Sequence, residues 1–252
     1  NRAGHAVMVV GWDDNYSKDN FRDGVKPEKD GAWLIRNSWG EGTGSYYDQS
    51  YFWMSYETFS LSDTAWVFDF SANDGYDNNY QVDGGLNVAH QSGYRKLANV
   101  FTAQTKQGVS SEDLKAVSLS ITSKTNVNYT IEIYTDLKDK TKPTSGTKQE
   151  TATTTGQTTY AGVYTIPLKA AVNLKPGTSY SVVVTTDIPA IDLEAAMVGD
   201  VNYNNEMVWE NHASSDNTAS YYFYGTGWHI PAIGIIRMCM VISVLKHLPP
   251  IM

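Results

Sequence analysis

The chain has 252 residues, enough for one large domain or two small ones with a core of their own. It carries 27 acidic and 19 basic residues, and the basic ones form no run, which argues against nucleic acid as a partner. A single cysteine, Cys239, excludes an internal disulfide and therefore a small disulfide-stapled scaffold.

The first forty residues of the chain contain two short apolar runs, at residues 4–12 and 32–40. Each carries one polar residue, His5 or Asn37, that a merely structural strand does not need. We expect the two runs to pair as an antiparallel hairpin across the polar segment between them.

The pairing that we expect sets Val10 opposite Ala32 and His5 opposite Asn37. The carbonyl oxygen of an asparagine side chain can accept a hydrogen bond from one imidazole N–H, which turns the other ring nitrogen outward. His5 and Asn37 then form the base and the orienting residue of a nucleophile-activating site.

The block His-Ala-Val with Val-Gly-Trp, followed by Trp-Leu-Ile-Arg-Asn-Ser-Trp-Gly, resembles the histidine and asparagine blocks of papain-like cysteine peptidases. The Asp-Asp-Asn-Tyr-Ser opening of the segment between the two runs, and the length of that segment, resemble a bacterial branch of the family. The resemblance implies three catalytic residues. His5 pairs with a cysteine thiolate, Asn37 orients His5, and Trp39 shields their hydrogen bond from water.

The same resemblance implies a nucleophilic cysteine and an oxyanion-stabilising glutamine, which we expect upstream of Asn1. Cys239 does not fit the role of nucleophile, because it lies late in the chain inside an apolar run that would raise its pKa. We therefore expect a piece of a cysteine-type endopeptidase that is inactive by itself.

Residues 13–30 are polar and predict a long solvated loop between the hairpin strands. The cluster Asp13, Asp14 and Asn15 is an alternative calcium site, but its spacing does not match a known calcium loop. We expect no metal site and no cofactor. After the loop, residues 51–56 alternate as a further strand.

The predicted organisation has four parts. Residues 1–65 form the C-terminal part of a papain-like peptidase domain, 66–80 a linker, 81–228 a lectin-like β-sandwich and 229–252 an atypical tail. The fold class expected is mainly β: the β-rich half of an α+β peptidase domain followed by an antiparallel jelly-roll sandwich.

The sandwich is predicted from apolar runs with period-2 alternation and turn residues between them. The clearest strands are residues 97–101, 117–121, 129–133, 163–166, 180–184 and 221–224. The order of features from Tyr76 to Gly162 resembles the lectin-like domain that follows the peptidase in some bacterial papain-like proteins. Residues 138–159 have almost no apolar side chains and predict a solvated loop or long hairpin tip.

Four aromatic residues of this second part are candidates for stacking on a sugar ring, although packing within the fold is the commoner role of such residues. They are Tyr94, Tyr203, Trp209 and Trp228. His90 and His212 have no second ligand at a telling spacing, and we assign them no role.

Residues 229–252 change character to a β-branched apolar run that is too short, and too interrupted by Arg237, for a membrane helix. Either this is the final strand of the sandwich or the sequence is aberrant, for example through a shifted reading frame.

Two functions follow from these features. The first is a piece of a secreted or surface cysteine peptidase of bacterial type, acting on a protein or peptide substrate. The alternative is a carbohydrate- or cell-surface-binding module with a non-catalytic peptidase remnant and a cell-wall or surface glycan as partner. For either, we expect an extracellular or cell-surface location and no membrane span.

Overall fold

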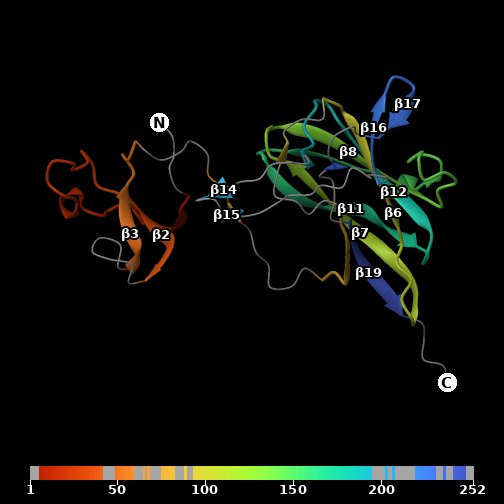
Figure 1. Cartoon of the computed structure of the whole chain (residues 1–252), viewed down its shortest axis with the longest axis horizontal. Coiled ribbons are helices and arrows are strands. Elements are labelled where there is room, and N and C mark those ends of the chain that lie inside the picture. Colours follow the sequence, from red (N-terminus) through yellow and green to blue (C-terminus); the bar gives the residue numbers. More distant parts are fainter. Residues whose placement is uncertain are drawn as a thin grey trace. The chain divides into compact units, whose positions relative to one another are not determined.

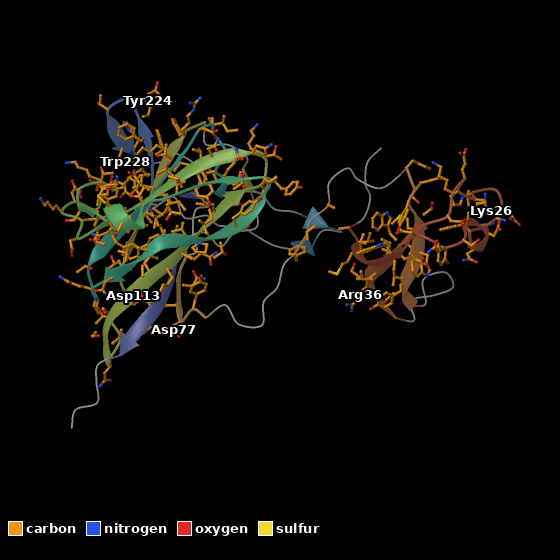
Figure 2. The ribbon with its side chains drawn as sticks, turned by 180° about the vertical axis from the view of Figure 1, so that it is seen from behind. Lys26, Arg36, Asp77, Asp113, Tyr224 and Trp228 are labelled. Carbon is orange, nitrogen blue, oxygen red and sulfur yellow. The ribbon has the colours of Figure 1, made fainter. Side chains whose placement is uncertain are left out.

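The computed structural model describes residues 6–41, 49–59, 65, 67–68, 75–82, 88–89, 93–194, 202–203, 206–207, 219–230, 235–236 and 241–247. For residues 39–41, 49, 88–89, 194, 202–203, 206–207, 235–236 and 241–247 it describes the backbone alone. The chain forms two compact units, Asn1–Ser71 and Ala72–Met252 (Figure 1). Lys26 and Arg36 belong to the first unit and Asp77, Asp113, Tyr224 and Trp228 to the second (Figure 2).

The second unit is built on two larger antiparallel sheets. The seven-stranded sheet has the order β10-β8-β12-β6-β16-β17, with β9 paired to β8. Its strands are β6 (Lys96–Thr102), β8 (Val127–Thr135), β9 (Thr147–Lys148), β10 (Thr154–Thr158), β12 (Ser179–Thr186), β16 (Ser220–Tyr224) and β17 (Gly227–His229).

The four-stranded sheet has the order β11-β7-β19-β4 and consists of β4 (Asn78–Tyr80), β7 (Val109–Ile121), β11 (Gly162–Leu174) and β19 (Val241–His247). A three-stranded sheet joins β5 (Val88–Ala89), β13 (Leu193–Glu194) and β18 (Ile235–Ile236), and a short hairpin joins β14 (Asn202–Tyr203) to β15 (Glu206–Met207).

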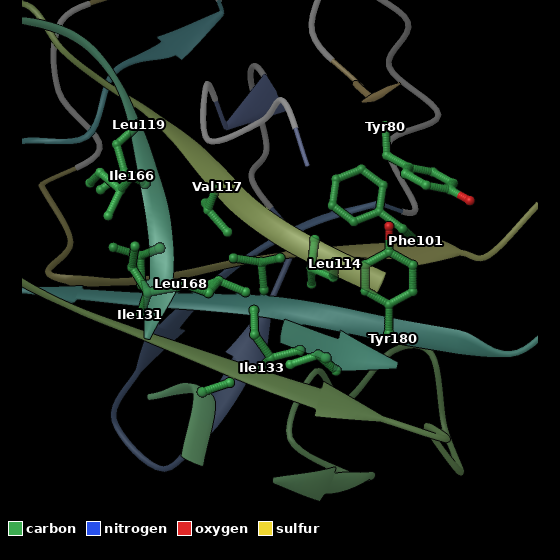
Figure 3. Packing of buried hydrophobic residues seen from close by; sticks show 14 of the residues in the cluster. Tyr80, Phe101, Leu114, Val117, Leu119, Ile131, Ile133, Ile166, Leu168 and Tyr180 are labelled. Carbon is green, nitrogen blue, oxygen red and sulfur yellow. The ribbon is translucent and has the colours of Figure 1, made fainter. Parts of the chain in front are cut away.

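The core lies between the two larger sheets, because both supply its side chains (Figure 3). Alternation explains how: β8 buries Val127, Ile131 and Ile133, while β11 buries Ile166 and Leu168 and leaves the residues between them more exposed. All six strands predicted from alternation fall within observed strands. The mainly β, antiparallel character of the fold is thus confirmed.

A buried polar network joins β4 to β7. Tyr80 donates to Glu112 Oε1 at 2.6 Å and accepts from the Gln104 backbone N–H at 2.7 Å, while Asn78 Nδ2 lies 3.2 Å from Glu112 Oε2. Burial, followed by the hydrogen bond to Glu112, raises the pKa of Tyr80. These contacts anchor a short strand that has few residues to pack.

The segment 138–159, which we expected to be a solvated loop or hairpin tip, contains two strands and a turn of 3-10 helix. These are β9, the turn η2 (Glu150–Ala152) and β10. β10 pairs with β8 from Thr154 opposite Ile131 to Thr158 opposite Val127. Threonine favours strands, and an edge strand needs only one partner, so a segment without apolar residues can still join the sheet.

The first unit is a three-stranded antiparallel sheet of order β1-β2-β3, with β1 (Met8–Asp13), β2 (Ala32–Glu41) and β3 (Gln49–Ser55). The central strand buries Ala32 and Ile35 completely. β1 and β2 form the predicted hairpin, and β3 overlaps the strand predicted at 51–56.

The predicted register of this hairpin is wrong. Asp13 lies opposite Ala32 and Met8 opposite Arg36, with an irregularity between Val9 and Gly11. Pairing therefore begins at Asp13 rather than at Val10. Both strands are nearly continuous apolar runs, so alternation could not fix the register.

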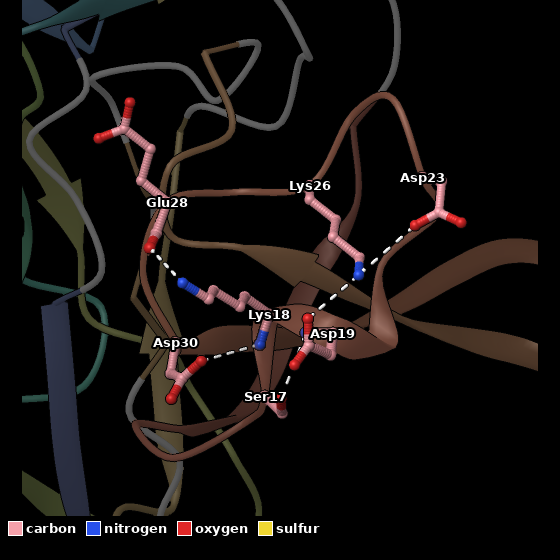
Figure 4. A network of polar contacts seen from close by, with 7 residues as sticks. All are labelled: Ser17, Lys18, Asp19, Asp23, Lys26, Glu28 and Asp30. Atoms are coloured by element: carbon pink, nitrogen blue, oxygen red, sulfur yellow. Dashed lines mark hydrogen bonds and ion pairs between the residues drawn. The ribbon is translucent and has the colours of Figure 1, made fainter.

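Residues 14–31 connect β1 to β2 and include the 3-10 turn η1 (Lys18–Asn20). A polar network holds this loop (Figure 4). The Lys18 backbone N–H donates to Asp30 Oδ1 at 2.9 Å, and Lys26 Nζ lies 3.1 Å from Asp19 Oδ1 and 3.4 Å from Asp23 Oδ1. Its side chains are mostly exposed, as a solvated loop predicts.

Candidate functional site

Asn37 lies in the central strand β2 and is 7% exposed. Its Oδ1 accepts a hydrogen bond from the Ser38 backbone N–H at 2.8 Å. Arg36, immediately before it, is the last residue of β2 in regular register with both neighbours, since the β2–β3 register shifts between Arg36 and Glu41. Asn37 therefore lies buried where the regular part of the sheet ends.

The structure does not describe the side chains of the other two predicted catalytic residues, His5 and Trp39. His5 lies outside the described residues, and Trp39 is described by its backbone alone, as part of β2. The predicted contact between His5 and Asn37 stays a prediction.

A cavity of about 700 Å³ lies in the second unit. One wall comes from the loop after β8 and the other from the β16–β17 hairpin. Its lining residues are Thr141, Lys142, Thr144, Ser145, Tyr221, Thr226, Gly227, Trp228, His229 and Ile230. An indole, a phenol and several hydroxyl groups therefore meet in one cavity.

Trp228 is held in place by three contacts. Its Nε1 donates to Thr144 Oγ1 at 3.2 Å, the Phe223 ring meets it edge-on with centroids 5.4 Å apart, and Lys96 Nζ lies 5.8 Å from its ring centroid. The indole is partly buried against the small core cluster on this side of the sheet. Through its hydrogen bond to Thr144, it links the hairpin to the loop that forms the opposite wall.

The loop wall is itself fixed. Ser145 Oγ accepts from the Asp139 backbone N–H at 3.0 Å and donates to the Asp139 carbonyl oxygen at 2.8 Å. Asp139 Oδ1 accepts from both the hydroxyl and the backbone N–H of Thr141, and Lys142 Nζ lies 3.2 Å from Asp139 Oδ2. The Thr141 donors, with Lys142, lower the pKa of Asp139.

A family model described as a lectin-like domain matches residues 80–230, which include the two walls of this cavity. The chain belongs to the lectin-like domain family.

Among solved structures, the chain is similar to the cysteine protease and lectin-like domains of Cwp84, a surface-layer-associated protein of Clostridium difficile, with 25% identity and a TM-score of 0.63. It is also similar to Cwp84 after propeptide cleavage, with 25% identity and a TM-score of 0.59. Each match covers 97% of this chain but only 52% and 58% of those chains. A search of curated proteins finds no match.

The other aromatic candidates of the lectin-like domain differ in what the structure says of them. Tyr94 stacks on Tyr222 with ring centroids 3.9 Å apart and packs against the main core, which is a packing role. Tyr203 is described by its backbone alone, and Trp209 lies outside the described residues. His90 and His212 also lie outside them.

Within the described part of the chain, no group of three or more His, Cys, Asp or Glu residues is placed to hold a metal ion. The carboxylates of the alternative calcium cluster have hydrogen-bond partners: Asp13 Oδ1 accepts from the Asn15 backbone N–H and Asp14 Oδ1 from the Tyr56 hydroxyl. No helix among the described residues is long and apolar enough to span a membrane.

Sequence reasoning named Trp228 but missed the loop wall of its cavity. This wall contains Thr141, Thr144 and Ser145. They belong to the segment 138–159, which the sequence predicts to be a solvated loop or hairpin tip without a binding role. The available signal was its density of hydroxyl residues, which by itself does not distinguish a binding wall from an exposed turn.

Proposed function

We propose that this chain is part of a surface-associated cysteine peptidase in which residues 1–65 carry the base side of the active site and a lectin-like domain follows. The observation that carries the proposal is the extent of the similarity to Cwp84. It covers 97% of this chain, and it is to a structure described as containing cysteine protease and lectin-like domains. A match of that extent includes most of the first unit as well as the second.

The chemistry proposed is hydrolysis of a peptide bond by a thiolate. A cysteine outside this chain attacks the carbonyl carbon, His5 holds its proton and returns it to the leaving amine, and Asn37 orients the imidazole. The geometry of Asn37 supports this role. It is buried, and its carbonyl oxygen accepts from the Ser38 backbone N–H, which holds the side chain in one orientation.

Exposed apolar residues on β1 further support a larger peptidase domain. Met8 and Trp12 are 57% and 67% exposed, and Val9 and Val10 nearly half exposed. A strand with apolar side chains on both faces is typical of one that is covered on both faces. We infer that β1 packs against peptidase-domain residues outside this chain.

The test is made on the full-length protein that contains this chain, with a thiol-dependent assay of peptide hydrolysis. His5→Ala should abolish activity. Asn37→Ala should reduce kcat by about 10²–10⁴-fold, because an imidazole that is no longer oriented loses the contribution of a positioned general base. Asn20→Ala, an exposed asparagine of the same unit, is the matched control. Full activity in His5→Ala, or activity in the 252-residue chain alone, would contradict the proposal.

A second function is favoured by the cavity at Trp228: the lectin-like domain binds carbohydrate and holds the enzyme at a glycan-bearing cell surface. An indole beside clustered hydroxyl groups suits a sugar, whose apolar face stacks on the ring while its hydroxyls find hydrogen-bond partners. A glycan array probed with the whole chain tests this, and absence of any binding would remove its support.

A further inference from the structure

We propose that the cavity at Trp228 selects an acidic sugar, one whose ring carries a carboxylate or a phosphate group. The proposal rests on the carbohydrate-binding function above and narrows it to a place and a class of ligand. The sugar ring stacks on the Trp228 indole, and its anionic group pairs with the Lys142 ammonium.

The stacking surface is preorganised. Trp228 is fixed by its hydrogen bond to Thr144, by the edge-on Phe223 ring and by Lys96. A ring that is already held in one orientation loses little side-chain entropy when a ligand docks on it. Tyr221 supports the same wall, since it is 2% exposed and part of the core cluster against which Trp228 packs.

The charge at the cavity is opposite to that of the chain. The formal net charge of the chain is -8. The residues that line the cavity, all of them described, nevertheless include the Lys142 ammonium and no carboxylate. Lys96, which does not line the cavity, has its ammonium 5.8 Å from the Trp228 ring centroid. A cavity lined by an ammonium group and by no carboxylate favours an anionic ligand.

The loop wall also contains a carboxylate, Asp139, which contacts the lining residues Thr141 and Lys142. Its oxygens accept from Thr141 and pair with Lys142, so its negative charge is already offset. The Lys142 side chain is 70% exposed, and an ammonium group has three donors, so Lys142 can keep Asp139 and take a ligand anion as well. Thr144 and Thr226 supply further hydroxyl groups for the sugar.

The experiment is calorimetric titration of the whole chain with oligogalacturonate and with a neutral galacto-oligosaccharide of the same length. A second pair, mannose 6-phosphate and mannose, separates phosphate from carboxylate recognition. We expect binding of at least one acidic probe, weakened by added salt, and about fivefold or greater preference over its neutral partner.

The variants assign the residues. Trp228→Ala should weaken binding about tenfold, and Trp228→Phe, which keeps a stacking ring if the alanine variant unfolds, should retain most of it. Lys142→Gln should remove the acidic preference and Lys142→Arg should keep it. Lys169→Gln, the same charge change at an exposed lysine of β11, is the matched control.

The outcomes are distinct. Equal binding of acidic and neutral probes, or equal behaviour of Lys142→Gln and Lys169→Gln, would overturn the acidic selection and leave carbohydrate binding intact. Binding of no probe at all would overturn both. Neither result bears on the peptidase proposal, which has its own assay.

Discussion

Tyr56 and Asp14 form a hydrogen bond that should make the first unit sensitive to alkali. The Tyr56 hydroxyl donates to Asp14 Oδ1 at 2.7 Å. Desolvation, with this hydrogen bond, raises the pKa of Tyr56 to about 12. Because the pKa is higher in the folded state, the stabilisation is complete below the unfolded pKa of 10.0 and is lost as the pH rises towards 12.

Tyr56→Phe should therefore flatten the pH dependence of unfolding of this unit between pH 10 and about 12. Thermal melts followed by near-ultraviolet circular dichroism across that range measure it. Tyr51→Phe, in the neighbouring strand β3, serves as control and should leave the dependence unchanged. An identical alkaline loss of stability in wild type and Tyr56→Phe would rule out this role.

Position 146 has to be glycine because the fold leaves no room there for a Cβ atom. A Cβ there would overlap the Thr135 carbonyl oxygen and lie 3.0 Å from a Leu137 methyl carbon. The carbonyl belongs to the β8–β9 pair and cannot move without breaking it.

Gly146→Ala should destabilise the lectin-like domain by about 1–3 kcal/mol, the usual cost of forcing an extra carbon into a packed site. Urea unfolding measures the change. Gly162→Ala is the matched control, because its added Cβ would make only ordinary contacts of 3.6 Å or more. A stability loss no greater than that of the control would show that the backbone yields at Gly146.

Sequence alone predicts a site residue well when the residues that identify it are close to it in the chain, and poorly when its partner is distant in the chain. Asn37 was identified from an eight-residue block, and the structure places it buried in β2, as a residue of a central strand should be. The partner of Trp228, Thr144, comes from a distant loop. Its proximity depends on which strands neighbour each other, and neither alternation nor turn signals specify that order.

At the scale of elements, alternation predicted where strands lie better than where they begin or how they pair. β11 and β7 extend well beyond the runs that marked them, and they pair with each other on both sides of a register shift between Pro167 and Val172. The β1–β2 register was missed for the complementary reason: apolar residues were present on both faces.

β19 is a structural strand of the lectin-like unit. It lies between β7 and β4 and pairs with both, with Val241 opposite Val117 on one side and Tyr80 on the other. The segment we regarded as atypical in sequence thus supplies an interior strand of the four-stranded sheet.

Ending the chain after Ile230 should therefore remove a partner from both β7 and β4 and leave the β7 edge open to other chains. We expect aggregation and loss of the cooperative unfolding transition, measured by size-exclusion chromatography and urea titration. A chain ending at His247 keeps β19 and is the control. Unchanged unfolding after truncation at Ile230 would contradict a structural role for β19.

At the scale of the whole molecule, the chain consists of two units with separate sheets. The buried residues that the structure describes in the main core cluster all lie between Tyr80 and Ile191, within the second unit. A unit with its own core should be able to fold by itself.

The chain of residues 72–252 should accordingly keep the unfolding transition that the lectin-like domain shows in the whole chain, within a few degrees. Calorimetry of both proteins measures this, and Leu114→Ala identifies the transition, since emptying that buried site should cost about 2–5 kcal/mol. Loss of the transition in residues 72–252 would mean that the first unit is needed for folding.

The position of β19 also bears on how quickly the lectin-like unit can fold. Its first and last described strands, β4 and β19, are hydrogen-bonded neighbours, so their pairing closes the longest loop between any two described strands of the unit. Closing such a loop costs entropy before any contact compensates, and proteins dominated by distant pairings fold slowly. During synthesis on the ribosome, the edge of β7 that pairs with β19 has no hydrogen-bond partner until Val241–His247 has emerged. That interval is when we expect the nascent chain to depend most on chaperones.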